Sequence, residues 1–231
     1  MIYLKGGAVP AGATLVVSLA TVPCFVGSEL IVGDGTNPST LTVNPGVTLP
    51  FNASTLHVRN ASPLIVDGSG GGITFTSATA SKGTWGIFFQ AGSGGTLKGA
   101  TIQYAGQNLG WGSFGVRVDS SALSTWSYVT LSDNSGTGLL VSGSGSVSMQ
   151  HSNFENGPAA GVTNNGSGSN ADATLSYWNG ASGPFTSNNN SQCNSSSVPA
   201  CTDDSIIGSD TTIGTNIANG VSYGGFVGSA N

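Results

Sequence analysis

The chain has 231 residues and a formal net charge of −5, with only five Lys or Arg residues. So few basic residues cannot neutralise a phosphate backbone or hold an anionic membrane, so we expect no nucleic-acid partner and no membrane insertion. Charged residues make up 6% of the chain, against about 25% in a typical soluble domain. Its polarity must therefore come from Ser, Thr, Asn and the 37 Gly residues.

Short apolar runs, each long enough for one strand, begin at the N-terminus. In chain order, the predicted strands are Ile2–Leu4, Thr14–Val17, Val22–Val26, Glu29–Val32, Thr40–Val43, Leu56–Val58, Leu64–Val66 and Ile73–Thr76. The apolar segment 8–27 is interrupted by Pro10, Gly12 and Pro23, so it is predicted as strands and not as a signal peptide or transmembrane helix. We expect residues 1–39 to form an N-terminal cap and the first strands.

A repeat follows in the middle of the chain. Gly115, Gly138 and Gly161 each open a similar segment at a constant interval, and Leu131 and Phe154 are separated by the same interval. Upstream, one longer offset joins both Gly86 to Gly115 and Ile102 to Leu131, which indicates the same frame with six residues inserted. This regular recurrence, with short apolar runs between Gly, Asn and Ser, predicts an all-β solenoid of about 23 residues per coil.

Inward side chains of such a solenoid stack into ladders about 4.8 Å apart. The expected ladders are Ile87, Val116, Leu139 and Val162, and Ile102, Leu131, Phe154 and Leu175. We interpret residues 1–231 as a single domain, with regular coils over 40–185 and a C-terminal loop with a last coil or cap over 186–231.

Five segments resemble right-handed parallel β-helix modules of bacterial secreted and cell-surface proteins, in the pectate-lyase-like superfamily. They are Leu41–Leu49, Leu64–Gly68, Ile73–Ser77, Gly83–Phe89 and Ala173–Pro184. The resemblance covers about residues 40–184 and implies a right-handed parallel β-helix in an extracellular or cell-surface location. Because this superfamily contains lyases, hydrolases, tailspikes, adhesins and stalks, it does not imply one function.

The catalytic residues of these families cannot be transferred to this chain. Lyases of the fold use an Asp cluster that binds Ca²⁺ together with a basic residue, and hydrolases use several Asp with Gly-His-Gly and Arg-Ile-Lys segments. The chain has no such cluster or segments, and its only adjacent acids, Asp203 and Asp204, lie outside the repeats. We therefore predict no metal ion and no cofactor.

One carboxylate pair remains as a catalytic candidate. The repeat frame aligns Ser132 with Glu155, which places Asp133 and Glu155 on neighbouring coils, and His151, a few residues before Phe154, could lie nearby. Two carboxylates roughly 5–9 Å apart are what glycoside hydrolysis requires. The alternative is that Asp133-Asn-Ser-Gly and Glu155-Asn-Gly are ordinary corner turns, which Asp, Asn and Gly favour for backbone reasons.

Aromatic residues offer candidates for ligand binding. If Tyr104, Trp111, Trp126 and Tyr128 face outward, they form a platform on which sugar rings stack. The alternative is burial, which the family resemblance favours for Trp85 and Trp178. A regular Thr/Ser face would instead order water and bind ice, but Thr101, Thr130 and Ser152 give only a short row.

The remaining candidates concern cysteine and charge pairs. Cys193 and Cys201 flank a short loop and form either a disulfide, which suits an oxidising compartment, or two free thiols. Cys24 lies in an apolar run and is expected to be a buried thiol. Arg117 and Asp119 share one face of a strand, where we expect a solvated ion pair.

The function expected from these features is that of an extracellular, non-catalytic module with a structural or adhesive role. It would act as a surface scaffold, a filament subunit or a polysaccharide-binding module, so its partners would be extracellular polysaccharide or copies of itself. The alternatives are a polysaccharide hydrolase or lyase and, as a lesser hypothesis, an ice-binding protein.

Overall fold

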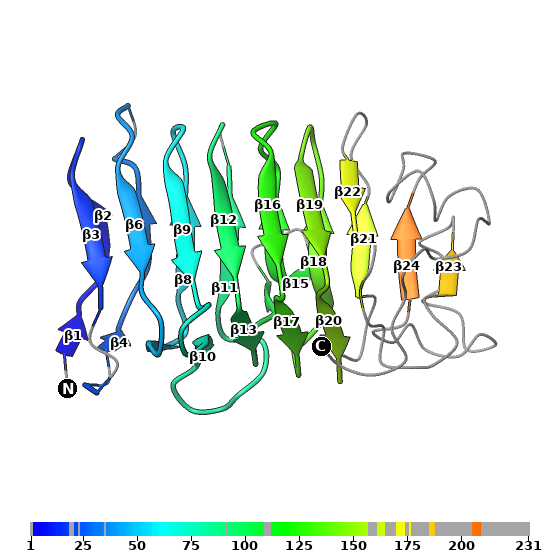
Figure 1. Cartoon of the computed structure of the whole chain (residues 1–231), viewed down its shortest axis with the longest axis horizontal. Coiled ribbons are helices and arrows are strands. Elements are labelled where there is room, and N and C mark those ends of the chain that lie inside the picture. The colour runs from blue at the N-terminus through cyan, green and yellow to red at the C-terminus, as the bar shows by residue number, and fades with distance from the viewer. Residues whose placement is uncertain are drawn as a thin grey trace.

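The computed structural model describes residues 2–18, 21–22, 24–34, 36–90, 92–108, 112–156, 161–164, 170–173, 176, 185–187 and 205–208. Within these residues the chain forms a parallel β-solenoid of about six turns, with roughly 26 residues per turn and no helix (Figure 1). The predicted all-β solenoid is therefore confirmed.

Each regular turn contributes one strand to each of three sheets, A, B and C (Figure 1). Sheet A contains β1 (Ile2–Leu4), β4 (Cys24–Val26), β7 (Thr48–Phe51), β10 (Ile73–Ser77), β13 (Ala100–Gln103), β17 (Thr130–Ser132) and β20 (Asn153–Glu155). Sheet B contains β2 (Gly7–Val9), β5 (Leu30–Val32), β8 (Thr55–Val58), β11 (Gly86–Phe89), β15 (Ser113–Val118), β18 (Thr137–Val141), β21 (Val162–Asn164), β24 (Ser205–Gly208) and β23 (Phe185–Ser187). Sheet C contains β3 (Thr14–Val17), β6 (Thr40–Val43), β9 (Pro63–Asp67), β12 (Gly94–Lys98), β16 (Ser124–Ser127), β19 (Ser146–Gln150) and β22 (Asn170–Asp172). The short β14 (Gln107–Asn108) pairs antiparallel with β15.

The two predicted ladders are present. On sheet B, successive strands pair Ile87 with Val116, Val116 with Leu139 and Leu139 with Val162. On sheet A, Ile102 pairs with Leu131, which pairs with Phe154. Leu175, expected to continue this row, lies outside the described residues.

The predicted period holds for only part of the solenoid. Val116, Leu139 and Val162 follow one another at that interval, but the step from Ile87 to Val116 is longer. The step from Leu64 to its partner Gly95 is longer still. The average coil is thus longer than predicted, because loops between the strands absorb the extra residues while the strands stay in register.

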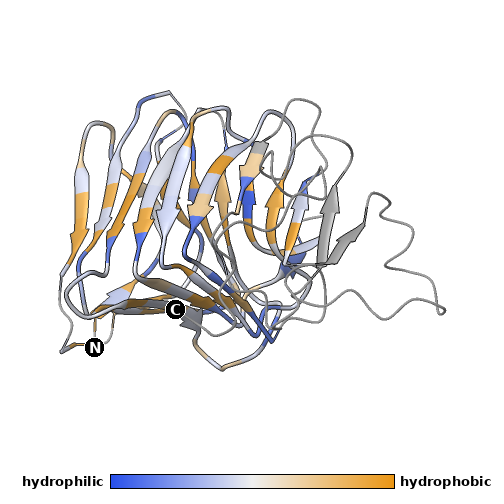
Figure 2. Cartoon of the chain, turned by 45° about the vertical axis from the view of Figure 1, so that its right-hand side comes forward, coloured by the Kyte–Doolittle hydropathy of each residue, from blue (hydrophilic) through white to orange (hydrophobic). Residues whose placement is uncertain are grey.

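The core is a single apolar column that runs along the solenoid axis. In strands such as β10, buried residues alternate with partly exposed ones, and the hydropathy alternates with them (Figure 2). Aromatic rings pack within this core: the rings of Phe51 and Trp85 stack with centroids 4.6 Å apart. Trp85 is fully buried, so the interpretation of this residue as part of the core is confirmed.

The first complete turn begins at the N-terminus. Ile2 pairs with Cys24, Gly7 with Leu30, and Thr14 with Thr40, so β1 to β3 form a turn in register with the next one. Residues 1–39 therefore contain β1 to β5 as solenoid strands. The strand Gly7–Val9 was not predicted, because Gly and Ala give a weak strand signal.

A buried asparagine fixes the corner between sheets A and B. Asn134 is 2% exposed, and its Oδ1 accepts a hydrogen bond from the Ala105 amide at 2.8 Å. Its Nδ2 donates to the Ile102 carbonyl at 3.3 Å. The side chain thus satisfies backbone groups of the preceding coil that would otherwise be buried without partners.

Candidate functional site

Asp133 and Glu155 lie on adjacent coils at the corner where the sheet A strands end, as the repeat frame predicted. Ser132 pairs in register with Glu155, and the Asp133 amide donates a hydrogen bond to the Glu155 carbonyl at 3.0 Å. Lys82, from the loop after β10, reaches the same corner. Its Nζ lies 3.3 Å from Asp133 Oδ1 and donates to the Asn156 carbonyl at 3.4 Å.

The two carboxyl groups have different environments. Burial raises the pKa of Glu155, and the negative charge of Asp133 raises it further. A carboxylic acid with a raised pKa beside an ionised partner is the arrangement of a general acid in glycoside hydrolysis. The backbone also fits the turn interpretation, because Asp133 and Asn156 have left-handed φ values of 53° and 56°.

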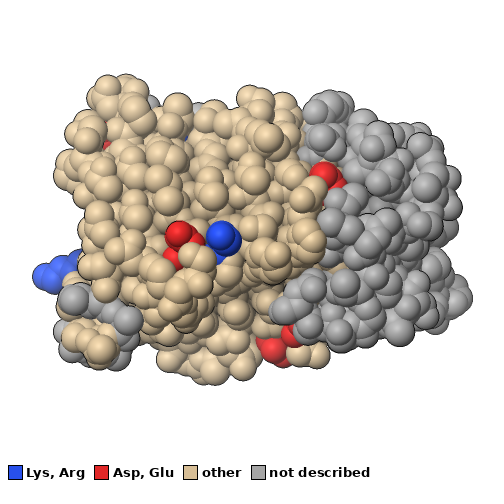
Figure 3. Space-filling view, viewed as in Figure 1, with Lys and Arg blue, Asp and Glu red and all other residues tan. Residues whose placement is uncertain are grey.

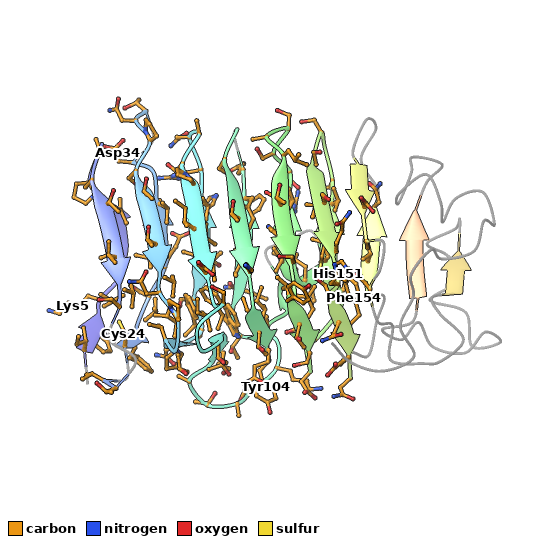
Figure 4. The ribbon with its side chains drawn as sticks, in the orientation of Figure 1. Lys5, Cys24, Asp34, Tyr104, His151 and Phe154 are labelled. Atoms are coloured by element: carbon orange, nitrogen blue, oxygen red, sulfur yellow. The ribbon has the colours of Figure 1, made fainter. Side chains whose placement is uncertain are left out.

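His151 does not join the carboxylate pair, contrary to expectation. It precedes β20, whereas Glu155 ends that strand, and four residues of strand span roughly 13 Å. The imidazole instead stacks on Tyr128, with ring centroids 5.4 Å apart and planes inclined by 20°. Figure 4 shows His151 and Tyr104 at opposite ends of the sheet A strands.

The structure separates the four aromatic ligand candidates. Trp126 is 1% exposed and packs in the core between Leu97 and Met149, so its expected role in ligand binding is corrected to a packing role. Tyr104 is half-buried at the corner between sheets A and B. Tyr128 is 52% exposed and is the candidate best placed to meet a ligand. Trp111 lies outside the described residues.

The comparison with protein families decides which β-solenoid this is. A family model described as "Right handed beta helix region" matches residues 40–177, more than half of the chain. The chain belongs to the right-handed β-helix family. Searches of curated proteins and of solved structures gave no significant match. The family confirms the predicted fold and its handedness, and it contains structural as well as enzymatic β-helix modules.

The outer face of sheet C is a wall of the β-helix with few charged side chains (Figure 3). Its middle outward row, paired in register along the solenoid, runs through Val16, Thr42, Ile65, Thr96, Thr125 and Ser148 and ends with Asp172 on β22. Asp67 and Lys98 pair in register at the edge of this sheet and bring opposite charges together. This wall therefore presents methyl and hydroxyl groups with little net charge.

The threonine row of the β-helix is longer than the sequence indicated. Thr48, Thr74, Thr101 and Thr130 pair in register on four successive strands of sheet A. Ser152, expected to continue this row, is buried and faces the core, where its Oγ accepts a hydrogen bond from the Val129 amide at 3.1 Å. The residue paired with Thr130 is Asn153, because a shift of one position along a strand changes the face.

The outer face of sheet B carries a cluster that the sequence patterns did not indicate. His57, Phe88 and Arg117 pair in register, with the imidazole stacked on Phe88 at 5.0 Å and the guanidinium carbon 5.0 Å from that ring. Arg117 donates two hydrogen bonds to Asp119, at 2.8 and 2.5 Å. These two side chains are only 11% and 19% exposed, so the expected solvated pair is in fact largely buried.

Insertions hid this cluster from sequence reasoning. The interval from His57 to Phe88 differs from the interval between Phe88 and Arg117, and neither equals the period of the repeat. No constant spacing therefore joins the three positions. A frame that allowed loops of variable length between aligned strands would have found the cluster.

The cysteines divide between the described and the remaining residues. Cys24 is a buried free thiol, as expected, and burial raises its pKa. Cys193 and Cys201 lie outside the described residues, so their disulfide stays a prediction. In the part of the chain that the structure describes, no three His, Cys, Asp or Glu residues gather as metal ligands. No helix in that part is long and apolar enough to cross a membrane.

Proposed function

We propose that this β-helix is an extracellular, non-catalytic module with a structural or adhesive role, and that its weakly charged walls bind polysaccharide. The observation that carries the proposal is the outer row of sheet C, from Val16 to Ser148, which repeats hydroxyl and methyl groups in register over six strands. Hydroxyl groups match the hydrogen-bonding groups of a neutral sugar, and methyl groups fit its C–H surface. Side chains repeated from strand to strand can also make the same contact with successive sugar units of a polysaccharide.

The test is retention of the purified protein on insoluble cellulose, chitin and β-1,3-glucan. Thr96→Lys combined with Thr125→Lys places two long cations in the middle of the wall, and retention should fall at least tenfold. Thr74→Lys on sheet A is the matched control and should bind like the wild type. If the double variant binds like the wild type, sheet C is not the contact surface.

Further copies of the chain are the alternative partner for the outer face of sheet C. Sedimentation velocity over a hundredfold range of protein concentration separates the two. A monomer that binds polymer supports polysaccharide as the partner, whereas oligomers or filaments without polymer binding overturn that partner and leave a structural, self-assembling module.

A second candidate, glycoside hydrolysis, is favoured by the raised pKa of Glu155 beside Asp133. Glu155 would protonate the leaving oxygen and Asp133 would act as base or nucleophile. Against this, Lys82 already pairs with the Asp133 carboxylate. A corner turn accounts for the same residues without catalysis.

Product chromatography after incubation with plant, algal and bacterial polysaccharides tests this candidate. Under the non-catalytic proposal no oligosaccharides appear. Oligosaccharides that the wild type releases and that the Asp133→Asn, Glu155→Gln double variant does not would establish an enzyme and overturn the first proposal.

A further inference from the structure

Tyr128 and His151 occupy a position where the earlier coils carry glycine. At the corner between sheets C and A, the register places Gly46, Gly72, Gly99, Tyr128 and His151 in one column. All five have left-handed backbones, with φ of 79°, 68°, 60°, 54° and 49°. Glycine adopts this conformation without strain. Tyrosine and histidine adopt it at a cost of roughly 1–2 kcal/mol each.

The two strained residues form one aromatic surface. Their rings stack at 5.4 Å on consecutive coils, and Tyr128 remains 52% exposed. The preceding coil adds no side chain at this corner, because it carries Gly99 there. Strained backbone at two stacked aromatic residues on successive coils, one exposed and one half-buried, is the kind of outlier that leads to a hypothesis of function.

Polar side chains flank this surface on both sides, and the exposed Lys98 of the preceding coil pairs in register with Ser127. Ser127 and Gln150 pair in register at the end of sheet C, directly before the two rings. Thr130 and Thr101 lie two positions beyond the corner, on sheet A. An exposed ring bordered by hydroxyl and amide groups matches a pyranose, whose C–H face packs on the ring while its hydroxyls form hydrogen bonds.

The geometry points to a sugar-binding subsite at this corner, in which the Tyr128 ring, backed by His151, stacks against one pyranose unit of a neutral polysaccharide. The subsite rests on the proposed function and identifies the part of the surface that recognises the sugar ring. Stacking depends on the aromatic face and not on the phenolic hydroxyl, so the site should accept Phe and reject Gly at position 128.

The test measures binding of the full chain to insoluble cellulose, chitin and β-1,3-glucan by depletion from solution. Tyr128→Gly removes the ring and relieves the left-handed strain, so the variant should fold, as the thermal melt will verify, yet bind at least tenfold more weakly. Tyr128→Phe should bind like the wild type. Tyr104→Gly is the matched control, because Tyr104 has a similar φ of 57° at the other corner; it should also bind like the wild type.

The outcomes separate the subsite from the function on which it rests. If the wild type binds and Tyr128→Gly binds equally well, the subsite is refuted while the polysaccharide-binding proposal stands. If Tyr104→Gly weakens binding as much as Tyr128→Gly does, the effect is not specific to this corner and the subsite is again refuted. If the wild type is retained on none of the polymers, both proposals fall.

Discussion

The Asp133 amide donates a hydrogen bond to the Glu155 carbonyl at 3.0 Å, so the backbone ladder itself fixes two acidic residues on neighbouring coils. Their proximity is therefore a property of the fold and does not depend on side-chain packing. Whether they serve catalysis or only a turn, this pairing has a measurable electrostatic consequence.

Stability should fall as pH rises through the range in which Glu155 ionises. The folded-state pKa of Glu155 is raised above its unfolded value of about 4.3, so the folded state binds this proton more tightly than the unfolded state. As pH rises through the folded-state pKa of Glu155, the carboxyl group ionises in the folded state too, and this contribution to the free energy of unfolding is lost. Glu155→Gln removes the titration, so the Tm of the variant relative to that of the wild type should rise as pH increases from about 4.3.

The Asp133→Asn variant is the control for this effect. It removes the second cause of the raised pKa but leaves burial, the larger cause, in place. Because the variant also loses the Lys82 ion pair, the slope of its Tm against pH, not its absolute Tm, should lie between the slopes of the wild type and Glu155→Gln. Parallel curves for all three proteins would contradict the raised pKa.

Asn134 should be costly to replace, because its side chain pairs with two buried backbone groups. Asn134→Ala leaves the Ala105 amide and the Ile102 carbonyl without their side-chain partner at a buried corner. Each unsatisfied buried group costs about 1–3 kcal/mol, so the free energy of unfolding should fall by at least that amount. Urea denaturation measures it. Asn156→Gly is the comparison and should change little, because Asn156 is exposed and its backbone is left-handed.

Trp126 should affect stability and not ligand affinity. Its ring is buried beside Phe89, with centroids 6.0 Å apart, and removing it leaves a large cavity. Trp126→Ala should cost about 3–5 kcal/mol, as measured by denaturation. Trp126→Phe keeps most of the volume and should retain polymer binding. A loss of binding in a well-folded Trp126→Phe protein would restore the ligand role that burial argues against.

The sequence predicted the fold because its signal is local and repeated. Val116, Leu139 and Val162 recur at one interval, and each must face the core for the coils to stack. The same frame placed Glu155 beside Ser132 correctly. Where loops vary in length, as between His57 and Phe88, the frame is lost and contacts across coils cannot be predicted from spacing.

Whether a given side chain points into the core or outward was harder to predict than the register of the strands. Trp126 and Tyr128 are two residues apart, yet one is buried and the other exposed, because the chain turns a corner between them. Ser152 was assigned to the outer face for the same reason: the corner at His151 interrupts the alternation that the strand would otherwise continue. Left-handed positions occupied by residues other than glycine leave little trace in the sequence, so the stacking of Tyr128 on His151 was not predicted, although Tyr128 was among the expected ligand residues.

The longer threonine row gives the ice-binding hypothesis a defined face and a decisive test. Thr48, Thr74, Thr101 and Thr130 repeat a methyl and a hydroxyl group at the strand spacing, about 4.8 Å. An ice-binding role predicts that the protein facets growing ice crystals, and that Thr101→Lys abolishes the effect because a long charged side chain holds the row away from the lattice. Thr125→Lys on sheet C should leave it intact. Round crystals in the presence of the wild type would remove ice binding and leave polysaccharide binding unaffected.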